Sequence, residues 1–93
     1  MSSSSAPPEQ SLIEYPSAFP IKVMGPHVDG FTESVVALAK QFDPGFDGAT
    51  VEARASKAGN YLALTLTITA TSREQLDGLY RSLSTHPMVR FVL

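Results

Sequence analysis

The amino-acid sequence predicts an α+β fold in which two helices cover one face of a four-stranded antiparallel sheet. Apolar residues alternate with polar ones over four short segments and recur at helical spacing over two longer ones. In chain order these segments are strand, helix, strand, strand, helix and strand. A chain of 93 residues has room for one hydrophobic core of ordinary size, so we expect a single domain.

Residues 18–25 form the first predicted strand, because their apolar side chains fall at every second position: Phe19, Ile21 and Val23. A helix is expected over residues 29–42, where the apolar side chains follow one helical stripe: Phe31, Val35, Leu38 and Phe42. Asp29 is the expected N-cap of this helix. Asp43 and Pro44 begin the turn that ends it.

Two further strands are predicted on either side of a tight turn. Residues 49–56 alternate, with one face formed by Val51, Ala53 and Ala55 and the other by Glu52 and Arg54. Residues 61–70 alternate more regularly, and their core face is expected to hold Leu62, Leu64, Leu66 and Ile68. Gly59 and Asn60 tolerate positive φ, so the two strands are expected to form a β-hairpin.

The second helix is expected to begin after Ser72, because Ser72 and Gln75 have the spacing of a capping box. Its apolar stripe is Leu76, Leu79, Tyr80 and Leu83, and Pro87 limits its length. A closing strand follows over residues 88–93. In that strand Val89, Phe91 and Leu93 alternate with Met88, Arg90 and Val92, and the second set is expected on the uncovered face of the sheet.

The order βαββαβ is that of the ferredoxin-like fold. We expect residues 12–93 to form this domain and residues 1–11, rich in Ser and Pro, to be a disordered leader. The absence of Cys excludes disulfides, thiolate metal sites and a Cys nucleophile. A formal net charge of −2 gives no general attraction for nucleic acid or an anionic membrane. The sequence lacks a signal peptide and a membrane span, so a cytoplasmic location is expected.

Several short segments carry a family resemblance: residues 12–16 (LIEYP) with Phe19, 22–25 (KVMG), 56–57 (SK) with 59–61 (GNY), 79–80 (LY) and 89–93 (VRFVL). In this order and spacing they resemble the YbeD-like family of small, uncharacterised bacterial proteins. The resemblance implies an ACT-like variant of the ferredoxin-like fold, which is similar to regulatory domains that bind small metabolites.

The predicted topology brings three connections to one end of the sheet: the loop after the first strand, the hairpin, and the loop after the second helix. The candidate ligand-binding residues there are Gly25, His27, Lys57, Gly59 and Asn60. A glycine lets the backbone approach a ligand, and the nearby helix N-terminus favours an anion. The expected ligand is therefore a small carboxylate or an amino acid, whereas the alternative is that these residues only form turns.

The uncovered face of the sheet supplies a second set of candidates, for binding a protein: Lys22, Met24, Arg54, Tyr61, Met88 and Arg90. An apolar centre with charged residues around it is typical of a protein interface. We therefore expect a protein partner, which could also be a second copy of this chain in a homodimer.

No catalytic residue, metal ligand or cofactor is predicted, because His27 and His86 lack the neighbours that a metal site or a catalytic base requires. The sequence thus predicts a non-enzymatic regulatory domain that senses a small metabolite and acts through a protein partner. The alternative is an interaction adaptor that uses the open sheet face without a small ligand. RNA binding is less favoured, because Tyr61 is the one aromatic residue expected on the outer face of the central strands.

Overall fold

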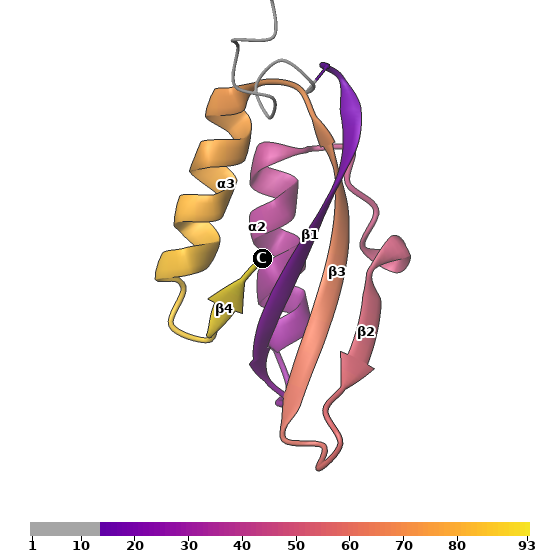
Figure 1. Ribbon diagram of the computed structural model, residues 1–93, viewed down its shortest axis with the longest axis vertical. Coiled ribbons are helices and arrows are strands. Elements are labelled where there is room, and N and C mark those ends of the chain that lie inside the picture. The colour runs from indigo at the N-terminus through magenta and orange to yellow at the C-terminus, as the bar shows by residue number, and fades with distance from the viewer. Residues whose placement is uncertain (1–13) are drawn as a thin grey trace, which may run out of the picture.

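The computed structural model describes residues 14–93, so the expected leader at residues 1–11 and the expected domain start at residue 12 lie outside it. The elements are β1 (Ser17–Pro26), α2 (Phe31–Phe42), the short 3-10 helix η2 (Gly48–Thr50), β2 (Glu52–Ala55), β3 (Tyr61–Ala70), α3 (Arg73–Thr85) and β4 (Phe91–Val92). Figure 1 shows both helices on the same side of the sheet. The predicted ferredoxin-like α+β fold is confirmed.

The four strands lie in the order β2-β3-β1-β4, and every neighbouring pair is antiparallel. The two central strands pair over their full length, from Ser17 opposite Ala70 to Pro26 opposite Tyr61. The edge strands are much shorter, since β2 has four residues and β4 has two. Most of the sheet therefore consists of the β1–β3 ladder, with a short strand on each side.

The hydrophobic core lies between this central ladder and the two helices. Its largest fully buried side chains come from alternate positions of β1 and β3 and from the inner stripes of the helices: Ile21, Val23, Phe31, Val35, Leu64, Leu66, Ile68, Leu79 and Leu83. The predicted alternation of residues 61–70 is thus confirmed, and β3 has the predicted bounds. The opposite face of the sheet has no helix over it within residues 14–93 (Figure 1), so we call it the open face.

The second strand is shorter than the sequence predicts. Asp47 accepts a hydrogen bond from the Ala49 N–H through its side chain and from the Thr50 N–H through its carbonyl. These local bonds hold residues 48–50 in η2, which competes with an extended backbone. Ala53 and Ala55 stand opposite Leu64 and Leu62 in the ladder, so they lie on the helix side of the sheet and apart from Glu52 and Arg54, as predicted. All four residues of β2 are nevertheless exposed.

The start of α2 differs from the prediction by two residues. The expected N-cap Asp29 is wrong: the N-cap is Gly30, which has φ of 88° and makes no side-chain capping bond. Glycine adopts this left-handed conformation without a steric penalty. The predicted cap of α3 is confirmed, since the Ser72 hydroxyl accepts a hydrogen bond from the Gln75 N–H at 3.0 Å.

Candidate functional site

At the end of the sheet where a ligand site was predicted, the loop after β1 and the β2–β3 hairpin lie in contact. The His27 N–H donates to the Asn60 carbonyl at 2.9 Å, and the His27 Nδ1 lies 3.0 Å from the Gly59 carbonyl oxygen. Gly59 has φ of 81°, as a tight hairpin turn requires. Lys57 is exposed in the same turn. These contacts fasten the hairpin tip to the loop after β1, and they occupy the backbone N–H and the Nδ1 of His27, two of the groups that a ligand could otherwise contact.

Gly25 is required by packing. A Cβ atom at this position would lie 2.5 Å from the Phe31 ring and 2.5 Å from the Met88 carbonyl oxygen, far inside normal contact distance. Gly25 is also buried. Its lack of a side chain therefore lets the loop after α3 and the first turn of α2 close against the end of β1.

The hollow beside this edge has the wrong charge for an anion. It measures about 560 Å³ and lies at the start of α2, between His27 and Glu33. Its two acidic side chains, Asp29 and Glu33, would repel a carboxylate. Binding of a carboxylate or amino acid at Gly25, His27, Lys57, Gly59 and Asn60 stays a prediction, and the local charge does not favour it.

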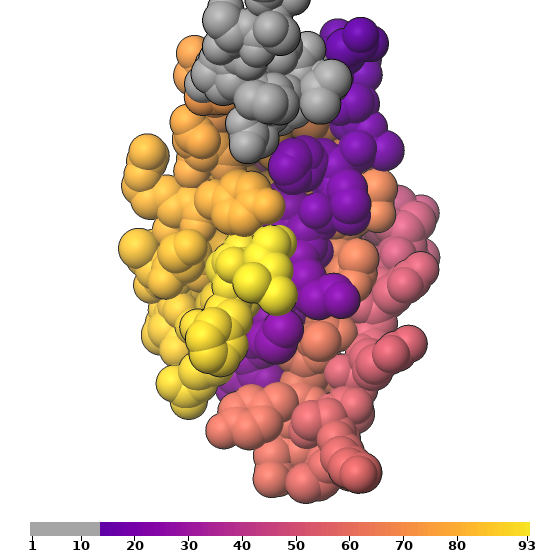
Figure 2. All heavy atoms as spheres, in the orientation of Figure 1, coloured from indigo at the N-terminus to yellow at the C-terminus, as the bar shows by residue number. Residues whose placement is uncertain are grey.

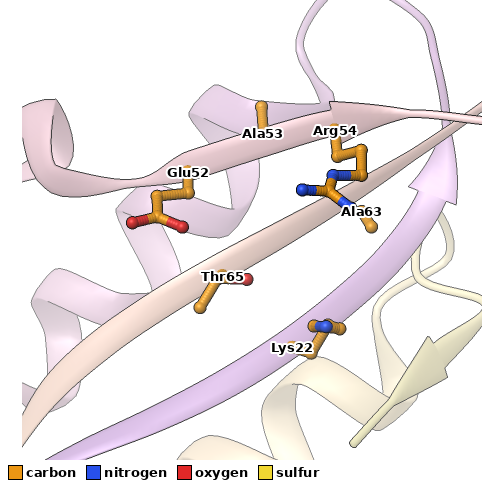
Figure 3. Close-up of a pocket in the computed structure, with 6 residues that line it drawn as sticks. All are labelled: Lys22, Glu52, Ala53, Arg54, Ala63 and Thr65. Carbon is orange, nitrogen blue, oxygen red and sulfur yellow. The ribbon is translucent and has the colours of Figure 1, made fainter.

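The open face holds the second set of candidates, and it is hollowed at several neighbouring points. One hollow of about 230 Å³ lies on the open face between Lys22, Glu52 and Arg54, where the small side chain of Ala63 on β3 leaves room. Figure 3 shows the Arg54 guanidinium extending toward Ala63, with Glu52 on the same side of β2 and Ala53 on the other. No ion pair joins these charged side chains within residues 14–93.

An apolar patch adjoins this charged hollow. Met24, Tyr61, Arg90 and Phe91 line a second hollow of about 410 Å³. Tyr61 is 55% exposed and Phe91 is 64% exposed, values that are high for aromatic side chains. A smaller hollow shares Arg54 with the first and Met24 and Tyr61 with the second, so the three form one continuous surface. Figure 2 shows this face, with β4 in yellow beside β1 in indigo.

The structure corrects the predicted orientation of the last strand. Val92 pairs with the buried Val23 and packs against the core, whereas Phe91 pairs with Met24 on the open face. The expectation that Met88 and Val92 lie on the uncovered face is therefore wrong, because both pack against the core. Sequence reasoning missed Phe91 as a surface residue. Periodicity gives no signal for it, since both alternating sets of residues 88–93 contain apolar side chains.

The other predicted members of this face lie together. Lys22, Arg54 and Arg90 surround the patch formed by Met24 and Tyr61. Among residues 14–93 no three His, Asp or Glu side chains are close enough to hold a metal ion. The arrangement suits contact with a surface or an extended segment, because the hollows lie side by side on the open face.

By its architecture this protein is a small ferredoxin-like domain with one face of its sheet open. No helix in the described part of the chain has the length and apolar character needed to cross a membrane. A family model described as "Protein of unknown function (DUF493)" matches residues 10–93. The chain belongs to this family, that of the UPF0250 or YbeD-like small bacterial proteins, and the resemblance found in its motifs is confirmed.

Three relatives illustrate the similarity. The chain is 70% identical to a UPF0250 protein of Leptothrix cholodnii over 87 residues, covering 94% of this chain and 96% of that protein. It is 64% identical, with the same coverage, to a UPF0250 protein of Bordetella pertussis. The solution structure of protein HP0495 from H. pylori matches with a TM-score of 0.74 and 18% identity, covering 97% of this chain and 90% of that one. At 18% sequence identity, the similarity to HP0495 shows a shared fold and nothing more.

Proposed function

We propose that this protein is a non-enzymatic interaction domain whose open face binds an acidic segment of another protein, with at least one apolar side chain in that segment. The observation that carries the proposal is the apolar patch of Met24, Tyr61 and Phe91, bordered by basic side chains on the face that no described helix covers. This is the adaptor function that the sequence offered as an alternative.

The residue types of the open face support a protein partner. Tyr, Phe, Met and Arg are enriched in protein interfaces, and Tyr and Arg often contribute most of the binding energy. All four types meet on this surface, as Tyr61, Phe91, Met24, Arg54 and Arg90. Because the two aromatic side chains are already exposed, a partner would remove their apolar surface from water without rearranging the core.

The charge of the same surface favours an acidic partner. The side chains lining its hollows include three of the chain's seven basic residues, Lys22, Arg54 and Arg90. They include one of its nine acidic residues, Glu52. The whole chain nevertheless has a formal net charge of −2, so the basic character is local to this face. A local field of this kind steers an acidic segment while the rest of the molecule repels it.

The local charge is too sparse to favour nucleic acid over a protein. Affinity for a phosphate backbone depends on many simultaneous contacts from Lys and Arg, and three basic side chains beside Glu52 provide few of them. Metabolite sensing and a cytoplasmic location stay predictions from the sequence.

A site-specific cross-linking experiment tests the proposal. A photo-reactive phenylalanine analogue is placed at Phe91 in one variant and at Val28 in a matched control, since both side chains are apolar and exposed. We expect protein cross-links from residue 91 and few from residue 28. Arg54→Glu and Arg90→Glu should each reduce the yield severalfold, while Lys40→Glu, on an exposed position of α2, should not.

Three outcomes would contradict the proposed function. The first is equal cross-linking from residues 91 and 28. The second is a cross-linked product that ribonuclease removes and protease does not. The third is an unchanged yield in both arginine variants.

A further inference from the structure

The outer edge of β2 is unoccupied by any strand of the described chain. β2 is the first strand of the sheet and pairs on one side only, with β3. All four of its residues are exposed, so no helix overhangs either of its faces. In Figure 1 it lies at the rim of the sheet. A strand from another chain could therefore approach this edge without displacing the core.

The hydrogen-bonding direction of each β2 residue follows from the hairpin. The Ser56 N–H donates to the Tyr61 carbonyl at 2.9 Å, so the backbone of Ser56 faces β3. Because this direction alternates along a strand, Glu52 and Arg54 also face β3. The N–H and C=O groups of Ala53 and Ala55 consequently point to the outer edge, where they are available to a neighbouring strand.

The charge pattern of β2 is complementary to itself. Glu52 and Arg54 are two residues apart, so their side chains lie on the same face of the sheet, as Figure 3 shows. In an antiparallel pair of two β2 strands centred on Ala53, each Glu52 would stand opposite Arg54 of the second copy. The same register pairs Ala53 with Ala53 of the second copy through the outward N–H and C=O groups.

Neighbouring registers are disfavoured by the same charges. Hydrogen bonding allows a slip of two residues in the pairing, because only the outward-facing residues can exchange bonds. One such slip places Arg54 opposite Arg54 of the second copy, and the other places Glu52 opposite Glu52. Like charges directly opposite each other destabilise a sheet. Many edge strands carry charges that prevent pairing, but here the alternation of sign selects one pairing.

We propose that two copies of this chain associate through their β2 strands, in antiparallel register about Ala53, to form a continuous eight-stranded sheet. The helices of both copies then lie on one side of this sheet and both open faces on the other. The patch of Met24, Tyr61 and Phe91 stays accessible in each copy, because it is centred on β1, β4 and the start of β3. The proposal does not rest on the proposed function. Arg54 belongs to both surfaces, whereas Glu52 and Ala53 test the dimer alone and Arg90 tests the open face alone.

Sedimentation velocity over a range of protein concentrations tests the dimer with three variants. Glu52→Arg and Arg54→Glu each create two like-charge pairs, and we expect each to weaken the dimer at least about tenfold. The double variant Glu52→Arg/Arg54→Glu exchanges the two charges and should restore association to near the wild-type level. Glu33→Arg, an exposed position on α2, is the control for the change in net charge.

Amide hydrogen exchange gives a second readout that does not depend on the charged variants. The Ala53 and Ala55 amides should exchange rapidly in dilute protein and become protected as the concentration rises. Ala53→Pro removes one outward N–H without touching the β3 ladder, and it should abolish the dimer in a protein whose exchange at β1 and β3 is unchanged.

Each of three results would overturn the proposal. One is a wild-type chain that stays monomeric up to about 1 mM. Another is a dimer that both single charge variants leave intact. The last is a double variant that associates no better than the single variants do.

Discussion

Strand β3 has ten residues and buries four of them, whereas its neighbour β2 has four residues and buries none. Both belong to one hairpin and share one ladder. The difference arises because the helices cover β1 and β3 and stop short of β2 (Figure 1). Folding free energy comes mainly from apolar burial, so β3 and its partners stabilise the fold. β2 and the open face bury little apolar surface, and they are where we propose that other chains bind.

The largest expected difference between the two strands is in side-chain truncation. Leu64 is fully buried on β3, and Leu64→Ala should lower the free energy of unfolding by about 3 kcal/mol. Arg54 is exposed on β2, and Arg54→Ala should change it by less than about 0.5 kcal/mol. Urea denaturation of both variants measures the difference. Similar losses in the two variants would show that β2 contributes to the core.

A substitution at Gly25 tests whether packing, and not a ligand, requires a glycine at the end of β1. Gly25→Ala would place a methyl group against the Phe31 ring and the Met88 carbonyl, and we expect a loss of about 1–3 kcal/mol in unfolding free energy. At Gly30 a methyl group meets no atom within 4 Å, so Gly30→Ala isolates the strain of positive φ, about 1–2 kcal/mol. An unchanged stability of Gly25→Ala in thermal denaturation would reject the packing account.

The side chain of Gln75 connects the end of α2 to the end of β3. Its amide accepts from the Thr71 N–H at 2.7 Å and donates to the carbonyls of Phe42 at 2.9 Å and Thr69 at 3.0 Å. Gln75→Ala leaves these backbone groups without their partner and should lower the unfolding free energy by about 1–2 kcal/mol. Gln41→Ala, at an exposed position of α2, is the control and should have little effect.

The smallest effect is expected at Tyr80, whose ring meets Phe19 edge-on at 6.5 Å. Burial raises the pKa of the Tyr80 hydroxyl. Near pH 10 the unfolded chain therefore loses this proton before the folded chain does, and stability falls as the pH rises further. Tyr80→Phe should leave stability at pH 7 nearly unchanged and make the alkaline loss shallower. Tyr61→Phe, on the exposed patch, is the control in the same pH series.

The sequence predicts β3 and α3 well, because each of them buries one face and exposes the other, which produces a clear pattern of apolar residues. Alternation over residues 61–70 follows from a strand with helices on one face, and the Ser72–Gln75 spacing directly encodes a cap. The shortened β2 was not predictable from alternation. Asp47 accepts local hydrogen bonds from Ala49 and Thr50, and these bonds hold residues 48–50 in a 3-10 helix where a strand was expected. Five of the six proposed interaction residues lie together on the open face. Met88 does not, since an irregular segment after α3 packs it against the core.

Hydrogen exchange along β3 tests the contrast between the two sides of this strand most directly. The amides of Leu64 and Leu66 point toward β1, while those of Ala63 and Thr65 point toward β2. At protein concentrations too low for association, the account predicts that the first pair exchanges only through global unfolding. The second pair should exchange faster, through local release of β2. Equal protection of all four amides would contradict the conclusion that β2 contributes little to stability.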